Sequence, residues 1–216
     1  MSTTSIHEPI PNMREKARNS RLPEHPSKIL IADDEHLVAS GLASNLKELG
    51  YLVIGPAADG DEAIELSEAM QPDIALLDIR MPKKDGLDAA EVLFQKMAIP
   101  VIIFSAYSDQ EYVDAGTRVG VFGYMLKPVT LDQLRVNISV AWSRYLDAAE
   151  KNSEITVLKQ RLEDRKLIEQ AKWLIVEQKT ISEPEAMKLL QRQARNNRRT
   201  LVDVAKSLIE NQNLYD

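Results

Sequence analysis

Five short apolar runs recur along the first part of the chain, and they restrict its fold more than any other feature. They lie at residues 29–32, 52–54, 74–77, 101–104 and 122–126. Apolar residues that follow one another without polar alternation indicate strands covered on both faces, which is typical of a parallel sheet. The sequence therefore predicts five buried parallel strands.

The stretches between these runs have helical spacing. Apolar residues recur at intervals of three and four over residues 37–49, 61–70, 87–97 and 109–119, and Gly50 and Gly120 follow two of these stretches as helix stops. Strands that alternate with helices predict an α/β fold, a doubly wound five-stranded parallel sheet. We expect this domain to span residues 28–142 and to end with a helix that begins near Leu131.

The first 27 residues differ from the rest in composition and in their lack of a hydrophobic pattern. Four prolines stand there among polar and charged residues without any periodicity. Such a segment buries too little apolar surface to offset the entropy of ordering. We expect residues 1–27 to be a disordered extension.

The helix that begins near Leu131 has no stop signal for a long distance. An apolar stripe with alternating spacings of four and three runs through Leu134, Ile138, Ala141, Tyr145, Ala148, Asn152 and Ile155, and Leu158 and Leu162 continue it after one slip. This pattern predicts a connector helix over residues 131–160. Its first turns can pack on the sheet while the rest is solvated, or the stripe can form a coiled coil with a second chain. Because the stripe outruns the sheet, we expect a homodimer through the connector.

Three further helical patterns follow, at residues 167–176, 182–194 and 201–208. Ser182 is a suitable N-cap, Pro184 suits a first helical turn, and Glu183 and Glu185 place acidic charge where the helix dipole favours it. The sequence predicts a small all-α three-helix domain over residues 158–212.

Charge is distributed unevenly over the chain, whose formal net charge is −6. Residues 155–216 hold 12 lysines and arginines against 9 aspartates and glutamates, while the preceding residues hold 15 against 24. Between residues 186 and 202 there is no acidic residue but there are five basic ones, namely Lys188, Arg192, Arg195, Arg198 and Arg199. This local patch suits an anionic partner.

Composition excludes several functions. The chain has no cysteine, so disulfides and thiolate chemistry are excluded, and its three scattered histidines do not suggest a metal site. No apolar run approaches the ~20 residues that span a bilayer, and the N-terminus lacks the apolar core of a signal peptide. We expect a cytoplasmic protein without a membrane partner.

Charged and hydroxyl side chains follow the predicted strands. Asp33 and Asp34 come at the end of the first strand, Asp78 ends the third, Ser105 the fourth and Lys127 the fifth. The carboxyl ends of parallel strands meet at one edge, where ligands bind. Crowded carboxylates repel one another, and a hard cation such as Mg²⁺ removes that repulsion. A carboxylate there can attack phosphorus to give an aspartyl phosphate, with Lys127 and Ser105 contacting the phosphoryl oxygens.

These residues carry a family resemblance. The elements Asp33-Asp34, Asp78, Met81-Pro82, Asp85-Gly86, Ser105-Ala106 and Lys127-Pro128 resemble the flavodoxin-like receiver domain of two-component response regulators.

That resemblance implies that Asp78 accepts phosphate from a sensor histidine kinase. Asp33, Asp34, Asp78 and the backbone carbonyl of Arg80 would hold Mg²⁺. It also implies a cis peptide between Lys127 and Pro128, and switch roles for Ser105 and Tyr124, whose hydroxyl and ring move after phosphorylation. A receiver is not an enzyme beyond slow self-dephosphorylation.

The C-terminal part resembles the ANTAR domain, the RNA-binding antiterminator module of some response regulators. The matching residues are Leu162, Arg165-Lys166, Ile168-Glu169, Ala171-Lys172, Ile181-Ser182-Glu183, Glu185-Ala186, Leu190, Ala194, Arg198, Leu201 and Val204-Ala205. Trp173 stands where the family commonly has glycine, and it can stack on a base. The resemblance implies a phosphorylation-controlled antiterminator that binds RNA hairpins.

Basic and amide side chains of this domain are the candidate RNA contacts. They are Arg165, Lys166, Lys172, Arg192, Arg195, Arg198 and Arg199 for phosphates, with Asn196 and Asn197 for base edges. Two alternatives stay open. The first is a DNA-binding regulator with a helix-turn-helix, and the second is a module whose receiver engages a protein partner.

Overall fold

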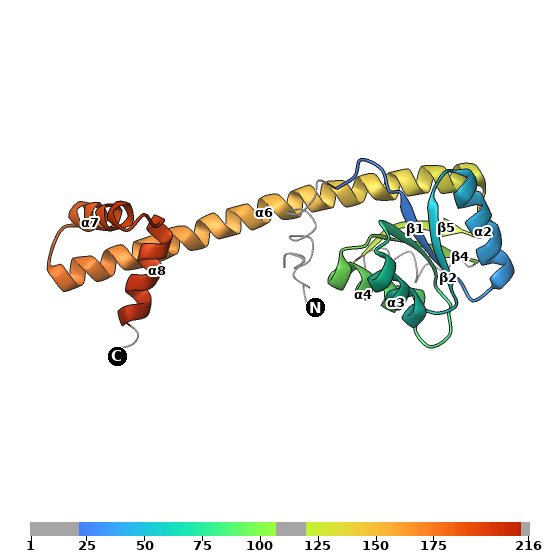
Figure 1. Ribbon diagram of the computed structural model, residues 1–216, viewed down its shortest axis with the longest axis horizontal. Coiled ribbons are helices and arrows are strands. Elements are labelled where there is room, and N and C mark those ends of the chain that lie inside the picture. The colour runs from blue at the N-terminus through green and yellow to red at the C-terminus, as the bar shows by residue number, and fades with distance from the viewer. Residues whose placement is uncertain (1–21, 107–119, 213–216) are drawn as a thin grey trace, which may run out of the picture. The chain divides into compact units, whose positions relative to one another are not determined.

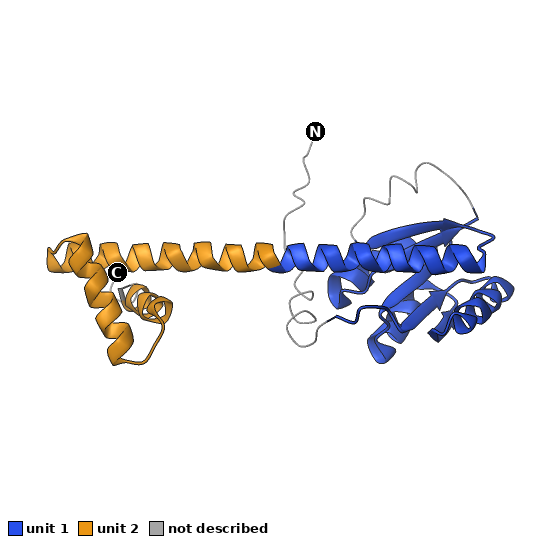
Figure 2. Cartoon of the chain, turned by 90° about the horizontal axis from the view of Figure 1, so that it is seen from above, with its two compact units in different colours: residues 1–153 blue, residues 154–216 orange. Residues whose placement is uncertain are grey.

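The computed structural model describes residues 22–106 and 120–212. The chain divides into two compact units, Met1–Ser153 and Glu154–Asp216, shown in blue and orange in Figure 2. Each unit has a hydrophobic core of its own. The helix predicted over residues 109–119 and residues 1–21 of the predicted extension lie outside the described residues.

The first unit contains a five-stranded parallel sheet (Figure 1). Its strands are β1 (Lys28–Ala32), β2 (Leu52–Ala57), β3 (Ile74–Asp78), β4 (Val101–Ser105) and β5 (Val121–Leu126). They lie in the order β2-β1-β3-β4-β5, and every neighbouring pair is parallel. All residues of β3 and β4 are buried, which is why their sequences are uninterrupted apolar runs. The predicted doubly wound α/β fold is confirmed.

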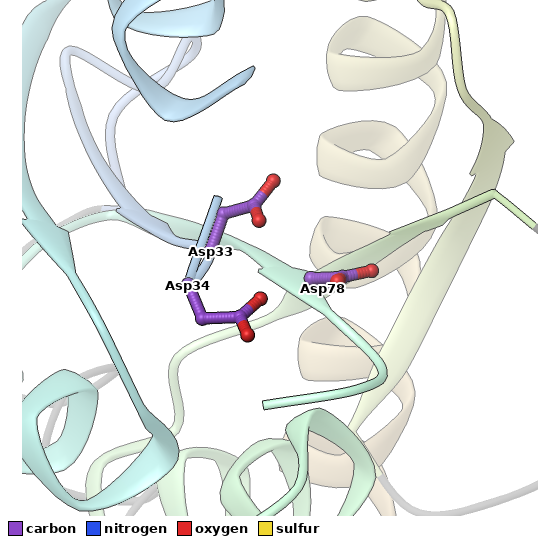
Figure 3. Close-up of side chains that lie close together, drawn as sticks. All are labelled: Asp33, Asp34 and Asp78. Carbon is purple, nitrogen blue, oxygen red and sulfur yellow. The ribbon is translucent and has the colours of Figure 1, made fainter. Parts of the chain in front are cut away.

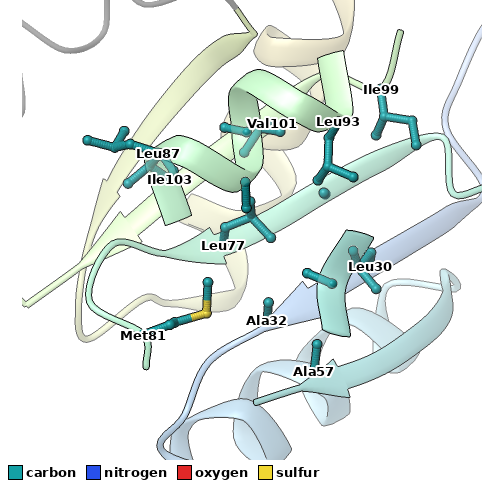
Figure 4. Packing of buried hydrophobic residues seen from close by; sticks show 14 of the residues in the cluster. Leu30, Ala32, Ala57, Leu77, Met81, Leu87, Leu93, Ile99, Val101 and Ile103 are labelled. Carbon is teal, nitrogen blue, oxygen red and sulfur yellow. The ribbon is translucent and has the colours of Figure 1, made fainter. Parts of the chain in front are cut away.

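Helices cover both faces of this sheet. They are α2 (His36–Glu48), α3 (Gly60–Met70), α4 (Gly86–Met97) and the first turns of α6 (Leu131–Lys179). On one face, Leu93 of α4, Ala63 of α3 and Leu77 of β3 belong to one buried cluster, part of which Figure 4 shows. On the other face, Leu46 of α2 and Leu134 of α6 belong to a second buried cluster. The two clusters hold the sheet between two layers of helices.

Residues 22–27 belong to the first unit, so the prediction that they are disordered is wrong. The indole nitrogen Nε1 of Trp142 donates to the carbonyl oxygen of Pro23 at 3.2 Å, and Leu22 packs beside that indole. Asp73 Oδ2 accepts from the backbone nitrogens of Ser27 and Lys28 at 2.8 and 2.9 Å. These partners lie far away in sequence, so no local pattern reveals them.

An aromatic cluster fixes α6 to the first unit beyond the sheet's own core. The ring of Phe122 lies 5.3 Å from Phe94 and 5.6 Å from Tyr145, and Trp142 lies 5.2 Å from Tyr145. The hydroxyl of Tyr145 donates to the carbonyl oxygen of Ala98 at 2.8 Å. Edge-to-face and tilted pairs at such distances are favourable.

This packing decides between the two interpretations of the first half of the connector stripe. Leu134, Ile138, Ala141 and Tyr145 are buried by the first unit itself, so the coiled-coil interpretation is wrong for these four residues. The later stripe residues Leu158 and Leu162 are 56% and 60% exposed. A contact with a second chain through the later residues stays a prediction.

The second unit contains the end of α6, α7 (Glu183–Asn196) and α8 (Leu201–Gln212). The connector predicted over residues 131–160 and the helical pattern predicted over residues 167–176 belong to one continuous helix, α6. Helix α6 is one element of 49 residues that contains no glycine or proline and ends before Thr180, whose φ is 52°. Without a helix breaker, the polar residues between 160 and 167 form an exposed helical turn rather than a loop.

The core of the second unit is small and apolar. It is built from Ala171 and Ile175 of α6, Ala186 and Leu190 of α7, and Val204 and Ala205 of α8. Ser182 and Glu185 form a reciprocal capping box at the start of α7, as the sequence predicted for this end.

Candidate functional site

Three carboxylates meet at the carboxyl edge of the sheet (Figure 3). One ligand oxygen of each of Asp33, Asp34 and Asp78 lies within 4.8 Å of the others. Asp33 and Asp78 are 2% and 6% exposed, while Asp34 is exposed. The backbone nitrogens of Glu35 and Ile79 donate to Asp33 Oδ1 and Asp78 Oδ1, each at 2.9 Å. These bonds fix one oxygen of each buried carboxylate.

Lys127 joins the two buried carboxylates. Its Nζ lies 2.8 Å from Asp33 Oδ2 and 3.2 Å from Asp78 Oδ2. Its backbone nitrogen donates to the carbonyl oxygen of Ser105 at 2.8 Å, and the peptide between Lys127 and Pro128 is cis, as the resemblance implied. The sequence therefore placed Lys127 correctly in the acidic pocket.

Electrostatics of the pocket follow from burial and crowding. Burial raises the pKa of Asp78 and the negative charge of Asp33 adds to this, while Lys127 opposes both. Burial alone would lower the pKa of Lys127, but its hydrogen bond to Asp33 and the charges of Asp78 and Asp33 raise it. One ammonium thus faces three carboxylates, so negative charge is left over. An all-oxygen set with excess negative charge is the kind that a hard divalent cation prefers.

Ser105 and Tyr124 lie in the same half of the sheet as Asp78. Asp78 pairs with Phe104 across β3 and β4, so Ser105 is one residue nearer the carboxyl edge, and its side chain is buried. Tyr124 pairs with Ile103 and is half-buried against the cluster that includes α4. Arg80 is exposed and lies two residues after Asp78. The topology therefore brings these residues to the predicted neighbourhood.

The loop that follows β3 is attached to the start of α3. Lys83 Nζ lies 2.6 Å from Asp59 Oδ2, and the backbone nitrogen of Gly60 donates to the carbonyl oxygen of Lys84 at 3.1 Å. At Gly86 an added Cβ would lie 1.9 Å from the carbonyl oxygen of Asp78. Local sequence patterns do not indicate the Asp59–Lys83 contact, because the two residues are distant in sequence.

In the second unit, three of the predicted RNA-contacting residues have partners within the chain. Lys172 Nζ lies 2.5 Å from Glu169 Oε2 and 3.0 Å from Glu183 Oε2, and these hydrogen bonds raise its pKa. Arg199 donates to the carbonyl oxygen of Asp203 and to Ser207 Oγ at 3.0 and 2.9 Å. Lys166 pairs with Glu163 at 3.0 Å. Lys172 and Arg199 therefore join helices or fix helix ends.

Three other basic residues form a cationic face on α7. Lys188, Arg192 and Arg195 are exposed on α7, and within residues 22–106 and 120–212 they form no ion pair closer than 4 Å. Spacings of four and three place them on one side of the helix. The other candidates Arg165, Asn196, Asn197 and Arg198 are exposed as well. Lys188 was not among the RNA contacts predicted from the sequence.

Comparison with known proteins assigns both units to a class. The family model "Response regulator receiver domain" matches residues 29–139, and the model "ANTAR domain" matches residues 156–209. The chain therefore belongs to the response regulators, and it acts as an RNA-binding antiterminator. This pair of domains indicates a regulator rather than a catalytic enzyme. No helix in the described residues is long and apolar enough to cross a membrane.

Among individual proteins, the transcriptional regulatory protein PdtaR of Mycobacterium tuberculosis is similar over both units. It is 38% identical over 185 residues, which cover 86% of this chain and 90% of PdtaR. The receiver domain of a modulated diguanylate cyclase from Desulfovibrio desulfuricans G20 has a TM-score of 0.52 and 35% identity, covering 56% of this chain and 96% of its own. The N-terminal domain of a three-domain response regulator from Carboxydothermus hydrogenoformans has a TM-score of 0.51 and 30% identity, covering 56% and 98%.

Proposed function

We propose that a sensor histidine kinase phosphorylates this chain on Asp78 and that the phosphate controls how the ANTAR unit binds RNA hairpins. The observation that carries the proposal is the position of Lys127, whose ammonium contacts both buried carboxylates of a three-carboxylate pocket. A cation there is ready to neutralise a phosphoryl group on Asp78. We expect this reaction to take place in the cytoplasm, where transcripts are made.

Asp78 is the nucleophile of the proposed transfer. Its Oδ2 forms the new oxygen–phosphorus bond while the phosphorus–nitrogen bond of the kinase phosphohistidine breaks and the imidazole leaves. Asp33, Asp34, Asp78 and the carbonyl oxygen of Arg80 would hold Mg²⁺, which would supply neutralising positive charge for the phosphoryl group. Lys127 contacts one of these oxygens, and Ser105 donates its hydroxyl to another. The ring of Tyr124 then turns inward into the space that Ser105 leaves.

Labelling with a small phosphodonor tests the site. The full chain is treated with acetyl phosphate and Mg²⁺, and intact-mass spectrometry counts phosphoryl groups. Wild type and the control Asp147→Asn, an exposed carboxylate on α6, should both take up one group, whereas Asp78→Asn should take up none. Equal labelling of Asp78→Asn would contradict the assignment of the nucleophile.

RNA contact is proposed for the cationic face of α7, formed by Lys188, Arg192 and Arg195, together with Arg165, Arg198 and the two asparagines after Arg195. Apart from Arg165, these cations lie between residues 186 and 202, a tract without any acidic residue, and this favours a polyanion. A competition gel shift with hairpin RNA and duplex DNA distinguishes the antiterminator from a DNA-binding regulator. Hairpin RNA should win, because splayed loop bases can be read. Tighter and sequence-selective binding of duplex DNA would overturn the proposal.

A homodimer is proposed through the later connector residues. Leu158 and Leu162 are more than half exposed, and Ile155 lies on the same side of α6. Light scattering of the phosphorylated full chain should show a dimer that Leu162→Glu converts to monomer. The matched control is Val157→Glu, because Val157 is 46% exposed but lies on another side of the helix. A monomeric wild type under these conditions would refute the dimer.

A further inference from the structure

An open hollow lies beside the first turns of α7 in the second unit. It has a volume of about 340 Å³ and is lined by Ile181, Glu185, Lys188, Leu189 and Arg192. Ile181 and Leu189 are half-buried and pack against the core of the unit, so their positions are fixed. The other three side chains are exposed at its rim. The hollow thus combines an apolar floor with charged edges.

The rim carries two cations that suit a nucleic-acid backbone. Lys188 and Arg192 are four residues apart on α7, and Arg195 continues the same side of the helix. None of the three has an ion-pair partner in the part of the chain that the structure describes. An apolar surface bordered by unpaired cations is the arrangement that accommodates an unstacked base and its neighbouring phosphates.

Glu185 is an acidic residue beside the two cations at the rim of the hollow, and its side chain is held in a fixed position. Its Oε2 accepts from the backbone nitrogen and from Oγ of Ser182, at 3.0 and 2.7 Å, so the side chain is held in place. These bonds also lower the pKa of Glu185, which keeps it ionised at neutral pH. Its second oxygen, Oε1, has no hydrogen-bond donor among the described residues. A fixed carboxylate would repel RNA unless it accepted a hydrogen bond from it.

An amino group on a base edge provides that hydrogen bond. Adenine, cytosine and guanine carry exocyclic amino donors, and a carboxylate is an acceptor only. Uracil has no exocyclic amino group, and its single N–H lies between two carbonyl oxygens that a carboxylate repels. A carboxylate oxygen at this position would therefore distinguish bases that carry an exocyclic amino group from uracil.

We propose that this hollow binds one unstacked RNA loop base that carries an exocyclic amino group, with Glu185 Oε1 accepting from that group. Ile181 and Leu189 contact the face of the base, and Lys188 and Arg192 contact the flanking phosphates. This inference rests on the proposed RNA-binding function and names the part of the surface that reads sequence.

The test uses the full chain and a hairpin RNA selected in vitro against the wild-type protein from a pool with a randomised loop. Each loop nucleotide is made abasic in turn, and dissociation constants are measured. One loop position should lose about 10-fold or more in affinity when its base is removed. Uracil at that position should cost the wild type about 10-fold relative to the selected base.

The decisive variant is Glu185→Gln, since glutamine keeps the capping box and therefore the helix. It should bind the uracil-substituted and selected hairpins within about 2-fold of each other, because an amide both donates and accepts. A second variant, Arg192→Ala, should weaken all hairpins about equally, and Arg161→Ala, an exposed arginine on α6 outside the hollow, should change nothing.

The outcomes separate the inference from the proposed function. If wild type binds the hairpin but Glu185→Gln retains the wild-type discrimination against uracil, the base assignment is wrong while RNA binding stands. If Arg192→Ala binds as tightly as wild type, the hollow is not part of the interface. If wild type enriches no hairpin from the pool, the inference and the RNA-binding function fail together.

Discussion

Replacing Tyr145 by phenylalanine perturbs the contact that holds α6 on the first unit. Tyr145 is 1% exposed, and its hydroxyl donates to the carbonyl oxygen of Ala98. Burial raises the pKa of this hydroxyl from 10.0 to about 12, and the negative charge of Asp73 adds to the shift. The substitution removes the hydrogen bond and the titration together while leaving the ring contacts with Phe122 and Trp142 in place.

The effect of Tyr145→Phe on the free energy of unfolding should change between neutral and alkaline pH. At pH 7 the variant should lose about 1 kcal/mol of unfolding free energy, the usual net value of a buried hydrogen bond. Because the folded pKa of Tyr145 lies above its unfolded value, the wild type keeps this contribution below pH 10 and loses it as pH rises from 10 to 12. At pH 11 the loss is about 1.4 kcal/mol, so the two proteins should be about equally stable near that pH.

Urea unfolding of the full chain in a Trp173→Phe background measures these differences. The chain has two tryptophans, so only Trp142, in the first unit, then reports by fluorescence. Tyr51→Phe is the control for the hydrogen bond: burial raises the pKa of Tyr51 too, but its hydroxyl forms no hydrogen bond with other described residues, so this variant should not lose stability at pH 7 through a lost bond. A stability difference between wild type and Tyr145→Phe that stays constant from pH 8 to pH 11.5 would refute the reasoning.

Five further substitutions have defined outcomes. Gly86→Ala should lower the free energy of unfolding in urea by about 3 kcal/mol or more, because its Cβ would collide with the Asp78 carbonyl. A Cβ at Gly41 meets nothing within 4 Å, so Gly41→Ala should stabilise α2 by about 0.5–1 kcal/mol. Asp78→Asn should raise the thermal midpoint at pH 7 without Mg²⁺, since burial raises the pKa of Asp78 and its charged form is therefore unfavourable above that pKa; a lowered midpoint would contradict this. Arg195→Ala should reduce the salt slope of RNA affinity by about one unit, and an unchanged slope would show that Arg195 is not part of the interface. Lys172→Met should lower the thermal midpoint of the second unit, because it removes the ion pairs with Glu169 and Glu183.

The sheet and its acidic edge could be predicted because both depend on local patterns and a simple topology. β3 and β4 are buried on both faces, so their sequences identify them as strands without reference to their neighbours. Once the strands are parallel, Asp33, Asp78 and Lys127 must lie at the same edge, and in the structure Lys127 Nζ lies 2.8 Å from Asp33 Oδ2 and 3.2 Å from Asp78 Oδ2. The clustering of these three residues therefore follows from the parallel sheet.

Features that depend on distant partners could not be predicted. The contact between Trp142 and Pro23 spans 119 residues, and nothing near Pro23 indicates it. The stripe that begins at Leu134 has the same spacing whether it packs on a sheet or on a second helix, so periodicity could not identify its partner. Likewise, the sequence shows that Lys172 is basic but not that Glu183, on the next helix, neutralises it.

The central claim is that phosphate on Asp78 changes RNA binding by the second unit. Fluorescence anisotropy with one labelled hairpin RNA, measured with the full chain before and after acetyl phosphate and Mg²⁺, tests it most directly. Wild type should bind about 10-fold more tightly after treatment, and Asp78→Asn should give one unchanged affinity in both states. Equal affinities of treated and untreated wild type, with labelling of Asp78 verified by mass spectrometry in the same sample, would contradict the claim.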